Sequence, residues 1–156
     1  MYFNYLNLLY MYQPRKKVPW HTYFMDIAEV VKKRSMDPKL QVGAVLVSLK
    51  DNRIISTGYN SVCANMDDSN IDWSNREHIK TIVVHAETNA VLYAQSKFED
   101  SILYTTTSPC MGCLKLLSAT KIKVVVYKRE YSDIDQVKIL CKYFKIELIK
   151  YETNSE

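Results

Sequence analysis

Two short motifs of this chain contain the side chains best suited to chemistry. They are His-Ala-Glu at residues 85–87 and Pro-Cys-Met-Gly-Cys at residues 109–113. One imidazole and two thiolates form a ligand set for a four-coordinate zinc ion with one position left open. Such a metal centre is close to neutral, so a water at the open position can be acidified to a pKa of about 7. The motifs therefore indicate hydrolytic chemistry at neutral pH.

The residues around the two motifs predict that each motif opens a helix. Cys110 and Cys113 are three residues apart, directly after a proline and before the apolar run at 114–119. In the first turn of a helix this spacing puts both sulfurs on one face. A helix N-terminus also favours thiolate over thiol. His85 opens a second predicted helix, which ends near Gln95.

Other interpretations of these motifs are a redox pair of cysteines and three quarters of a structural zinc site. No fourth Cys or His lies close by in sequence, and a structural site would leave Glu87 without a role. His-x-Glu followed by Pro-Cys-x-x-Cys is the known signature of zinc-dependent nucleobase deaminases, in which the glutamate transfers protons. We therefore predict a catalytic zinc site. Its ligands are His85, Cys110 and Cys113.

Length and composition indicate one soluble domain. The chain has 156 residues, of which 47% are hydrophobic and 24% are charged, as in ordinary globular proteins. The net charge of +4 suits a protein that handles phosphorylated metabolites but is too small to indicate nucleic-acid binding. Four cysteines, two of them in the metal motif, favour a reducing compartment over a disulfide framework, with Cys63 and Cys141 as free thiols.

The start of the chain differs from the rest. Residues 1–12 are apolar and rich in tyrosine, but they lack the basic region and the small-residue cleavage site of a secretory leader. No run approaches the roughly 18 to 20 apolar residues of a membrane span. We expect a cytoplasmic protein without membrane contact, in which residues 1–18 are an arm outside the core and residues 19–156 are a single zinc-dependent domain.

Hydrophobic patterning predicts a hairpin followed by alternating strands and helices. This order indicates an α/β sandwich with a mixed sheet. The polar, aperiodic stretch 59–79 is predicted as a loop. The remaining predicted elements are a helix at 22–34, strands at 42–47, 53–58, 102–107, 122–127 and 146–149, and a helix from Asp133, as its cap, to Tyr143.

Five segments make the chain similar to the deoxycytidylate deaminases of the cytidine-deaminase superfamily. The resemblance extends over about residues 19–150. The two zinc motifs are shared by the wider superfamily, whereas the first segment and the Asn after Glu-Thr point to the nucleotide branch. The segments are WHTYFM (20–25), RSMDPKLQVGA (34–44), GYN (58–60), HAETNA (85–90) and SPCMGC (108–113).

The resemblance implies a three-layer α/β/α sandwich with a five-stranded mixed sheet. It implies zinc-dependent hydrolysis of dCMP to dUMP and ammonia, with Glu87 as the residue that takes a proton from water, protonates N3 and assists the leaving amine. It also implies a homo-oligomer, a hexamer or a dimer, that dCTP activates and dTTP inhibits.

The resemblance further suggests which residues bind the substrate. Asn60 matches an asparagine that contacts the sugar, although it could also be a simple turn residue. Tyr131 matches a tyrosine against the substrate, although packing is an alternative. Ala86 and Ser108 are also assigned to substrate binding. For the phosphate, which needs a charge-assisted donor, Lys39 is favoured; Arg34, Arg76, Lys128 and Arg129 stay open.

The chain departs from the family pattern after Gly58-Tyr59-Asn60. Residues 61–68 contain no glycine, whereas relatives often have a glycine-containing loop there that binds the effector nucleotide. A backbone that approaches phosphates closely usually needs glycine, so regulation by dCTP and dTTP is an open question. Cys63 and His78 could be the remnants of a second zinc site, but two ligands do not make one.

Two further functions compete with dCMP deamination. One is deamination of another base, such as cytosine, cytidine or adenosine in tRNA. A tRNA enzyme would be expected to carry a more basic face than a net charge of +4 indicates. The other is a catalytically inactive zinc-binding assembly module, for which Glu87 would have no use.

Overall fold

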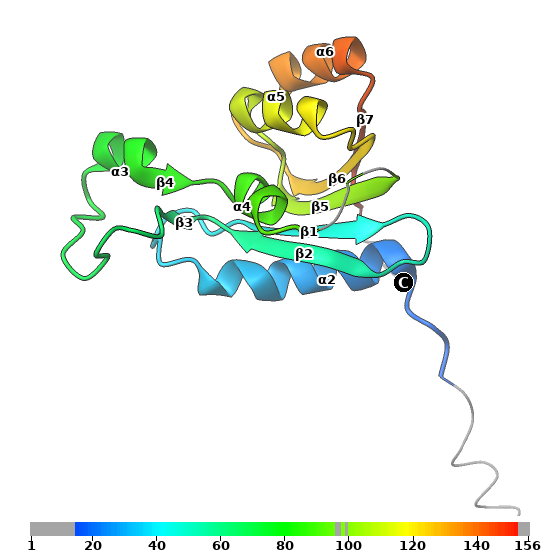
Figure 1. Cartoon of the computed structure of the whole chain (residues 1–156), viewed down its shortest axis with the longest axis horizontal. Coiled ribbons are helices and arrows are strands. Elements are labelled where there is room, and N and C mark those ends of the chain that lie inside the picture. The colour runs from blue at the N-terminus through cyan, green and yellow to red at the C-terminus, as the bar shows by residue number, and fades with distance from the viewer. Residues whose placement is uncertain (1–14, 96–97, 99, 153–156) are drawn as a thin grey trace, which may run out of the picture.

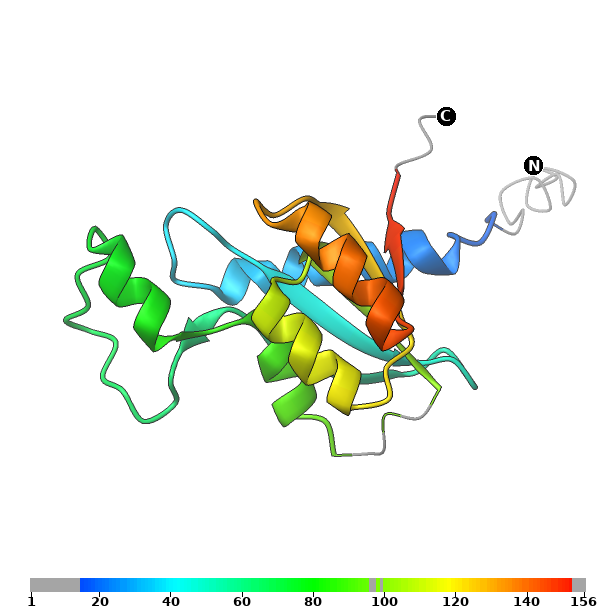
Figure 2. The same cartoon turned by 90° about the horizontal axis from the view of Figure 1, so that it is seen from above.

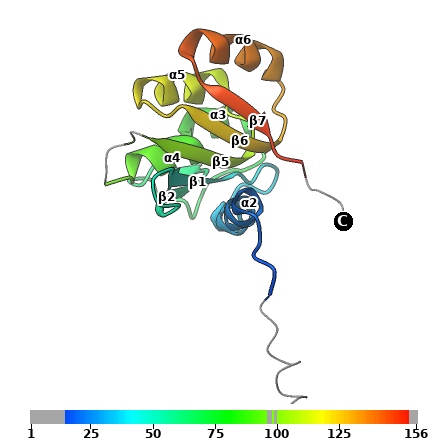
Figure 3. The same ribbon diagram turned by 90° about the vertical axis from the view of Figure 1, so that its right-hand side faces the viewer.

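The computed structural model describes residues 15–95, 98 and 100–152, which form a three-layer α/β/α sandwich (Figure 1). A five-stranded sheet is the middle layer. Helix α2 (Trp20–Val31) covers one face of the sheet, and helices α4 (Ala86–Leu92), α5 (Met111–Ala119) and α6 (Ile134–Phe144) cover the other (Figure 3). The predicted fold class and the predicted five-stranded mixed sheet are confirmed.

The strand order of the sheet is β2-β1-β5-β6-β7. Strand β1 pairs antiparallel with β2 and β5, whereas β5, β6 and β7 are parallel. Because the carboxyl ends of parallel strands reach the same edge, Thr107 at the end of β5 lies beside Arg129 at the end of β6. The strands are β1 (Gly43–Ser48), β2 (Ile54–Tyr59), β5 (Ser101–Thr107), β6 (Val124–Arg129) and β7 (Glu147–Lys150).

Strand β1 explains why the sequence shows a continuous apolar run rather than alternation. Ala44 and Leu46 belong to the apolar cluster under α4, α5 and α6. Val45 and Val47 belong to the second cluster, under α2. Successive side chains of a strand point to opposite faces, and here both faces are covered by helices. Every position of the strand is therefore buried or nearly so.

The segment predicted as a loop at 59–79 is not wholly a loop. Strand β3 (Ser61–Val62) pairs with β4 (Val83–Val84), and helix α3 (Arg76–Ile82) begins inside the segment. The helix begins there because the side chain of Asn75 accepts a hydrogen bond of 3.2 Å from the backbone N–H of His78, which caps its first turn. Helix α3 and this small ribbon project from one end of the sandwich (Figures 1 and 2).

Two predicted helix ends are also corrected. The helix predicted at 22–34 is α2 followed by a 3₁₀ turn, η1 (Lys32–Arg34), and α4 ends at Leu92 rather than near Gln95. Asp133 occupies the N-cap position of α6, but its side chain does not cap that helix. Its Oδ2 instead accepts a hydrogen bond of 3.3 Å from the backbone N–H of Met111, the first residue of α5. The prediction that the Asp133 side chain caps α6 is therefore wrong: one carboxylate oxygen accepts from α5, and the other has no hydrogen-bond partner.

Gly58 allows helix α4 to lie directly on strand β2. A Cβ atom at this position would lie 2.2 Å from the carbonyl oxygen of Ala86 and 2.3 Å from the backbone nitrogen of Ala90. Both are backbone atoms of α4, so the helix itself would have to move. The glycine is needed for this close approach and not for an unusual backbone angle, since no glycine among the described residues has positive φ.

Replacing Gly58 by alanine should therefore destabilise the fold. We expect a loss of about 1–3 kcal/mol in the free energy of unfolding, as for other overpacked cores. Urea denaturation followed by circular dichroism measures it, with Thr57→Ala, an exposed neighbour on the same strand, as the control. Equal stability of the Gly58→Ala variant and the wild type would contradict the close packing of α4 on β2.

The described residues before helix α2 add no further helix or strand to this architecture. Residues 15–18 are exposed and have no regular secondary structure, and residues 1–14 of the predicted arm lie outside the described residues. Within the described part of the chain, no helix has both the length and the apolar character that crossing a membrane requires.

Candidate active site

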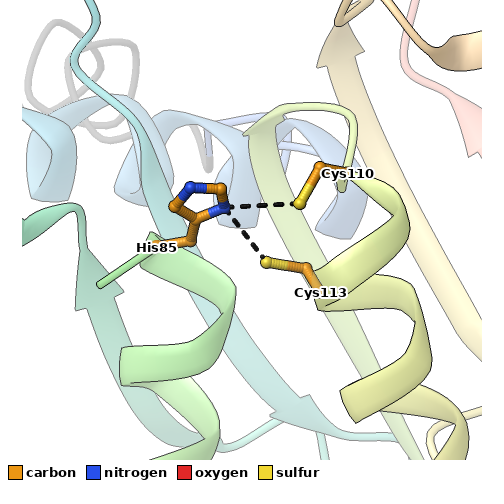
Figure 4. Close-up of side chains that lie close together, drawn as sticks. All are labelled: His85, Cys110 and Cys113. Atoms are coloured by element: carbon orange, nitrogen blue, oxygen red, sulfur yellow. Dashed lines mark hydrogen bonds between the residues drawn. The ribbon is translucent and has the colours of Figure 1, made fainter. Parts of the chain in front are cut away.

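Three ligand-type side chains meet at the N-termini of two neighbouring helices. His85 immediately precedes α4, Cys110 immediately precedes α5, and Cys113 lies in the first turn of α5. The Nδ1 atom of His85 lies 3.4 Å from the sulfur of Cys110 and 3.3 Å from that of Cys113 (Figure 4). All three ligand atoms lie within 4.8 Å of one another. We call these three residues the ligand cluster.

The ligand cluster fits a zinc ion. Nitrogen and sulfur donors at about 2.0–2.3 Å from a tetrahedral zinc lie about 3.5–3.8 Å from one another. The two measured N···S distances of 3.3 and 3.4 Å are close to that range. Thiolate and imidazole donors suit zinc better than magnesium or calcium, which prefer oxygen. Three protein donors leave a fourth position for water or substrate.

Proton sharing within the ligand cluster also favours a cation there. The pKa of Cys110 is lowered, chiefly by its hydrogen bond with Cys113 and also by that with His85. The same bond between the sulfurs, together with burial, raises the pKa of Cys113. The first thiolate therefore forms readily, while the second thiol keeps its proton. A cation between the sulfurs would replace that shared proton.

Glu87 lies in the first turn of α4, two residues after His85, and its side chain is buried with only 4% of the residue exposed. Burial raises the pKa of Glu87 to about 7. A cation in the ligand cluster would favour the carboxylate and lower that pKa again. A carboxyl group whose two protonation states have similar free energies near neutral pH can both accept and donate a proton.

A cavity of about 100 Å³ opens beside the ligand cluster and Glu87. Cys113 does not line this cavity but belongs to the ligand cluster. Lys39 lines an adjoining surface hollow instead. Seven of the nine predicted site residues line the cavity itself, namely Asn60, His85, Ala86, Glu87, Ser108, Cys110 and Tyr131.

Two of these residues shape the cavity through backbone contacts. The Oδ1 atom of Asn60 accepts a hydrogen bond of 2.8 Å from the N–H of Val42, and its Nδ2 donates one of 2.7 Å to the carbonyl oxygen of Leu40. The hydroxyl of Ser108 accepts a hydrogen bond of 2.8 Å from the N–H of Tyr131. Asn60 thus fixes the loop that forms one wall, and Ser108 fixes the backbone of Tyr131.

An ion pair ties helix α3 to that same loop. Two guanidinium nitrogens of Arg76 donate to the two carboxylate oxygens of Asp37 at 2.9 and 2.8 Å. The Asp37 carboxylate also accepts from the N–H groups of Lys39 and Leu40. Burial acts to raise the pKa of Asp37, but these hydrogen bonds outweigh it and the pKa lies below its usual value. The pair holds α3 against the mouth of the cavity.

Several cavity residues were not singled out from the sequence. Ile79 and Lys80 come from α3, which lies partly in the stretch predicted as a loop; Arg76, an open candidate for the phosphate, lies on the same helix. The capping residue Asn75 is the signal that could have revealed this helix. Thr107 also lines the cavity, at the end of β5. The further lining residues are Asp37, Leu40, Val42 and Val83.

The structure also bears on the cysteines outside the ligand cluster, which were predicted to be free thiols. All four cysteines are free, as expected for Cys63 and Cys141. Cys63 is exposed, and its Sγ donates a weak hydrogen bond of 3.5 Å to the carbonyl oxygen of Ile82. Among the described residues, neither Cys63 nor His78 belongs to a group of three or more side chains close enough to hold a metal ion. The structure thus offers no support for a second zinc site at these residues.

Comparisons with known proteins agree with this geometry. Residues 18–129 match the family model described as "Cytidine and deoxycytidylate deaminase zinc-binding region". A probable deoxycytidylate deaminase of Drosophila melanogaster is 38% identical over 126 residues, which are 73% of this chain and 62% of that protein. The human deoxycytidylate deaminase is 33% identical over 124 residues, 75% of this chain and 69% of that protein.

Solved structures show the same fold. The dCMP deaminase of cyanophage S-TIM5 in apo form has a TM-score of 0.71 and 26% identity, and the match covers 87% of this chain and all of that one. A structure of tRNA:A34 deaminases has a TM-score of 0.60 at 22% identity, with coverage of 85% of this chain and 100% of that one. Because the fold occurs in both kinds of deaminase, it does not by itself select a substrate.

The family follows from the match over residues 18–129. The chain spans about half to two thirds of the length of the first curated relatives it matches, with 62% for the fly protein and 56% for one from Caenorhabditis elegans. The matched region contains both zinc motifs and the whole cavity except Tyr131. This chain belongs to the cytidine and deoxycytidylate deaminase family.

Proposed function

We propose that this protein is a zinc-dependent hydrolase that converts dCMP and water into dUMP and ammonia. The observation that carries the proposal is a buried glutamate, Glu87, which lines the same cavity as His85 and Cys110 of the ligand cluster. Curated relatives named deoxycytidylate deaminases, from fly to human, support the choice of substrate. The cyanophage dCMP deaminase supports it as well.

The chemistry follows from the donor set and from Glu87. A zinc ion held by the ligand cluster would supply a Lewis acid at its open position. Glu87 accepts a proton from the attacking water, passes it to N3 of the cytosine and assists the departure of ammonia. One C–O bond forms at C4 and one C–N bond breaks there, so the reaction needs no redox partner. Burial raises the pKa of Glu87 and a bound cation would lower it, and these opposing effects suit a carboxyl group that first accepts and then donates a proton.

The substrate-binding assignments belong to this proposal. The side chains of Asn60 and Tyr131 are the candidates for contact with the sugar and the pyrimidine, and both residues line the cavity. Ala86 and Ser108 line it as well, as expected for residues beside the base. Lys39 stays the predicted phosphate ligand, and its place in the adjoining hollow is compatible with a phosphate that extends out of the cavity.

Assembly, regulation and location also stay predictions. The family resemblance favours a homo-oligomer, a hexamer or a dimer, with dCTP and dTTP as effectors. A second hollow lies beside residues 61–64 and includes Arg34 and Trp73. The free thiols favour a reducing compartment such as the cytoplasm.

A comparison of substrates tests the proposed function. The zinc-loaded chain should deaminate dCMP with a kcat/KM about 10- to 100-fold higher than that for deoxycytidine, because charge-assisted hydrogen bonds to the phosphate add binding energy. Cytidine, dCTP and a tRNA anticodon stem-loop complete the series, with ammonia release as the measurement. A preference for a nucleoside or for the tRNA fragment would refute dCMP as the substrate.

A further inference from the structure

A surface hollow of about 420 Å³ adjoins the catalytic cavity. Leu40, Thr107 and Tyr131 line both the cavity and the hollow, so the two are neighbours along the same walls. The hollow also has the larger volume. A ligand whose base occupies the cavity can therefore extend past these three residues into the hollow.

The hollow contains two cations without an acidic partner. Its charged residues are Lys32, Lys39, Arg129 and Glu130. Lys32 is paired with Glu29, and Glu130 is paired with Lys150 at 3.0 Å. Among the residues that the structure describes, neither Lys39 nor Arg129 has a carboxylate within ion-pair distance. The hollow thus has an unbalanced charge of about +2, equal and opposite to that of a phosphate monoester near pH 7.

Arg129 contacts the loop that carries Lys39. Arg129 ends strand β6, and a guanidinium nitrogen of Arg129 donates a long hydrogen bond of 3.5 Å to the carbonyl oxygen of Gln41. Gln41 and Lys39 belong to the same loop, which Asp37 and Asn60 hold in place. Both cationic residues therefore belong to backbone segments that hydrogen bonds hold in place.

Thr107 adds an unsatisfied polar atom at the boundary between the cavity and the hollow. Only 5% of this residue is exposed, and its Oγ1 has no hydrogen-bond partner. A buried hydroxyl without a partner is uncommon in folded proteins and usually marks a missing water or ligand. Thr107 pairs with Arg129 on the neighbouring strand, so this unpartnered hydroxyl lies close to the backbone of Arg129.

The basic residues of the cavity itself are less suitable for a phosphate. Arg76 gives two hydrogen bonds to Asp37, and Lys80 is paired with Glu77 at 2.8 Å. Both charges are neutralised by carboxylates. A phosphate there would have to compete with these acids, whereas in the hollow it would meet two uncompensated cations.

We propose that Arg129, together with Lys39, binds the 5′-phosphate of the substrate nucleotide and makes the site select nucleotides over nucleosides. This inference rests on the proposed function, since it takes the cavity as the site of the base. The guanidinium of Arg129 can give two parallel hydrogen bonds to phosphate oxygens, and the ammonium of Lys39 adds a point charge. Arg129 is a specificity residue in this scheme and takes no part in proton transfer.

The variant Arg129→Gln tests the inference. Arg129 is exposed, so we expect the variant to fold as the wild type does. Its kcat/KM for dCMP should fall about 10- to 100-fold, mainly through KM, while the kcat/KM for deoxycytidine stays within about twofold of the wild-type value. Lys39→Gln should show the same split. Arg53→Gln, an exposed arginine in the β1–β2 turn at the opposite end of these strands, is the matched control.

Binding measurements separate this inference from the proposed function. Calorimetric titration with dUMP and with deoxyuridine needs no turnover; Arg129→Gln should weaken dUMP binding and leave deoxyuridine binding unchanged. Equal losses for both ligands, or no loss for dUMP, would overturn the role of Arg129. If the wild type fails to deaminate dCMP but binds dUMP through Arg129, the proposed function fails and the phosphate site stands.

Discussion

Replacing Glu87 by glutamine should reduce the turnover of dCMP by about 10²–10⁴-fold, the usual contribution of general acid–base catalysis. Glutamine has nearly the same size and keeps the packing of α4, but its amide cannot accept and return a proton. Glu87 is not part of the ligand cluster, so the variant should still bind one zinc ion per chain. Steady-state ammonia release and metal analysis of the same sample measure both effects.

The matched control for this substitution is Glu147→Gln, an exposed glutamate on strand β7. It makes the same chemical change far from the cavity and should leave kcat unchanged. A Glu87→Gln variant with more than about a tenth of the wild-type kcat would show that another group transfers the protons. Loss of zinc from that variant would instead indicate that Glu87 supports the metal.

The second large effect is expected for Cys110→Ser. A serine hydroxyl is a much poorer zinc ligand than a thiolate, so we expect the variant to lose zinc and activity together. Binding to the folded state alone stabilises a protein by about 2.7 kcal/mol when the free ligand is at 100 times its Kd. The wild type should therefore melt at a higher temperature with zinc than with a chelator. The variant should melt at the same temperature in both.

The exposed Cys63 provides the control for Cys110. Cys63→Ser should keep one zinc ion per chain and the zinc-dependent shift in melting temperature. If Cys110→Ser also kept one zinc ion with unchanged affinity, Cys110 would not be a ligand. This comparison also separates a general effect of removing a thiol from the loss of a metal ligand.

The sequence alone predicts most of the sandwich, because its signals are local. Strands β1 and β5 are continuous apolar or β-branched runs, and helix α5 begins directly after a proline and the first cysteine of its motif. Both motifs are predicted to open helices, and both do so. The order of the His and Cys motifs is likewise sufficient to predict the ligand cluster, which the structure brings together.

Contacts between distant segments are what the sequence leaves open. Asp133 is a residue type that often caps helices and it directly precedes α6. Its carboxylate nevertheless accepts a hydrogen bond from the backbone N–H of Met111 in α5, a contact that only the tertiary structure shows. The choice among the basic residues also depends on contacts between distant segments. Arg76 and Arg129 are equivalent candidates for a phosphate in the sequence, and they become different only once Asp37 is seen to neutralise the first.

Helix α3 was missed for a different reason. Its capping residue lies among many other polar residues, and its 7 residues are too few to show a clear helical period. Short helices depend on tertiary contacts for stability, and α3 has such a contact in the ion pair between Arg76 and Asp37. The signal for this helix is thus partly non-local.

The ligands at the starts of α4 and α5 have one more consequence. His85 and Cys113 are 28 positions apart in the chain, and a metal ion bound to both would cross-link the protein across that distance. A covalent link closing a loop of this length would reduce the conformational entropy of the unfolded chain by the equivalent of about 3–4 kcal/mol. The ion would then cross-link the two helices in addition to its role in the reaction, and its loss would destabilise the structure around the cavity.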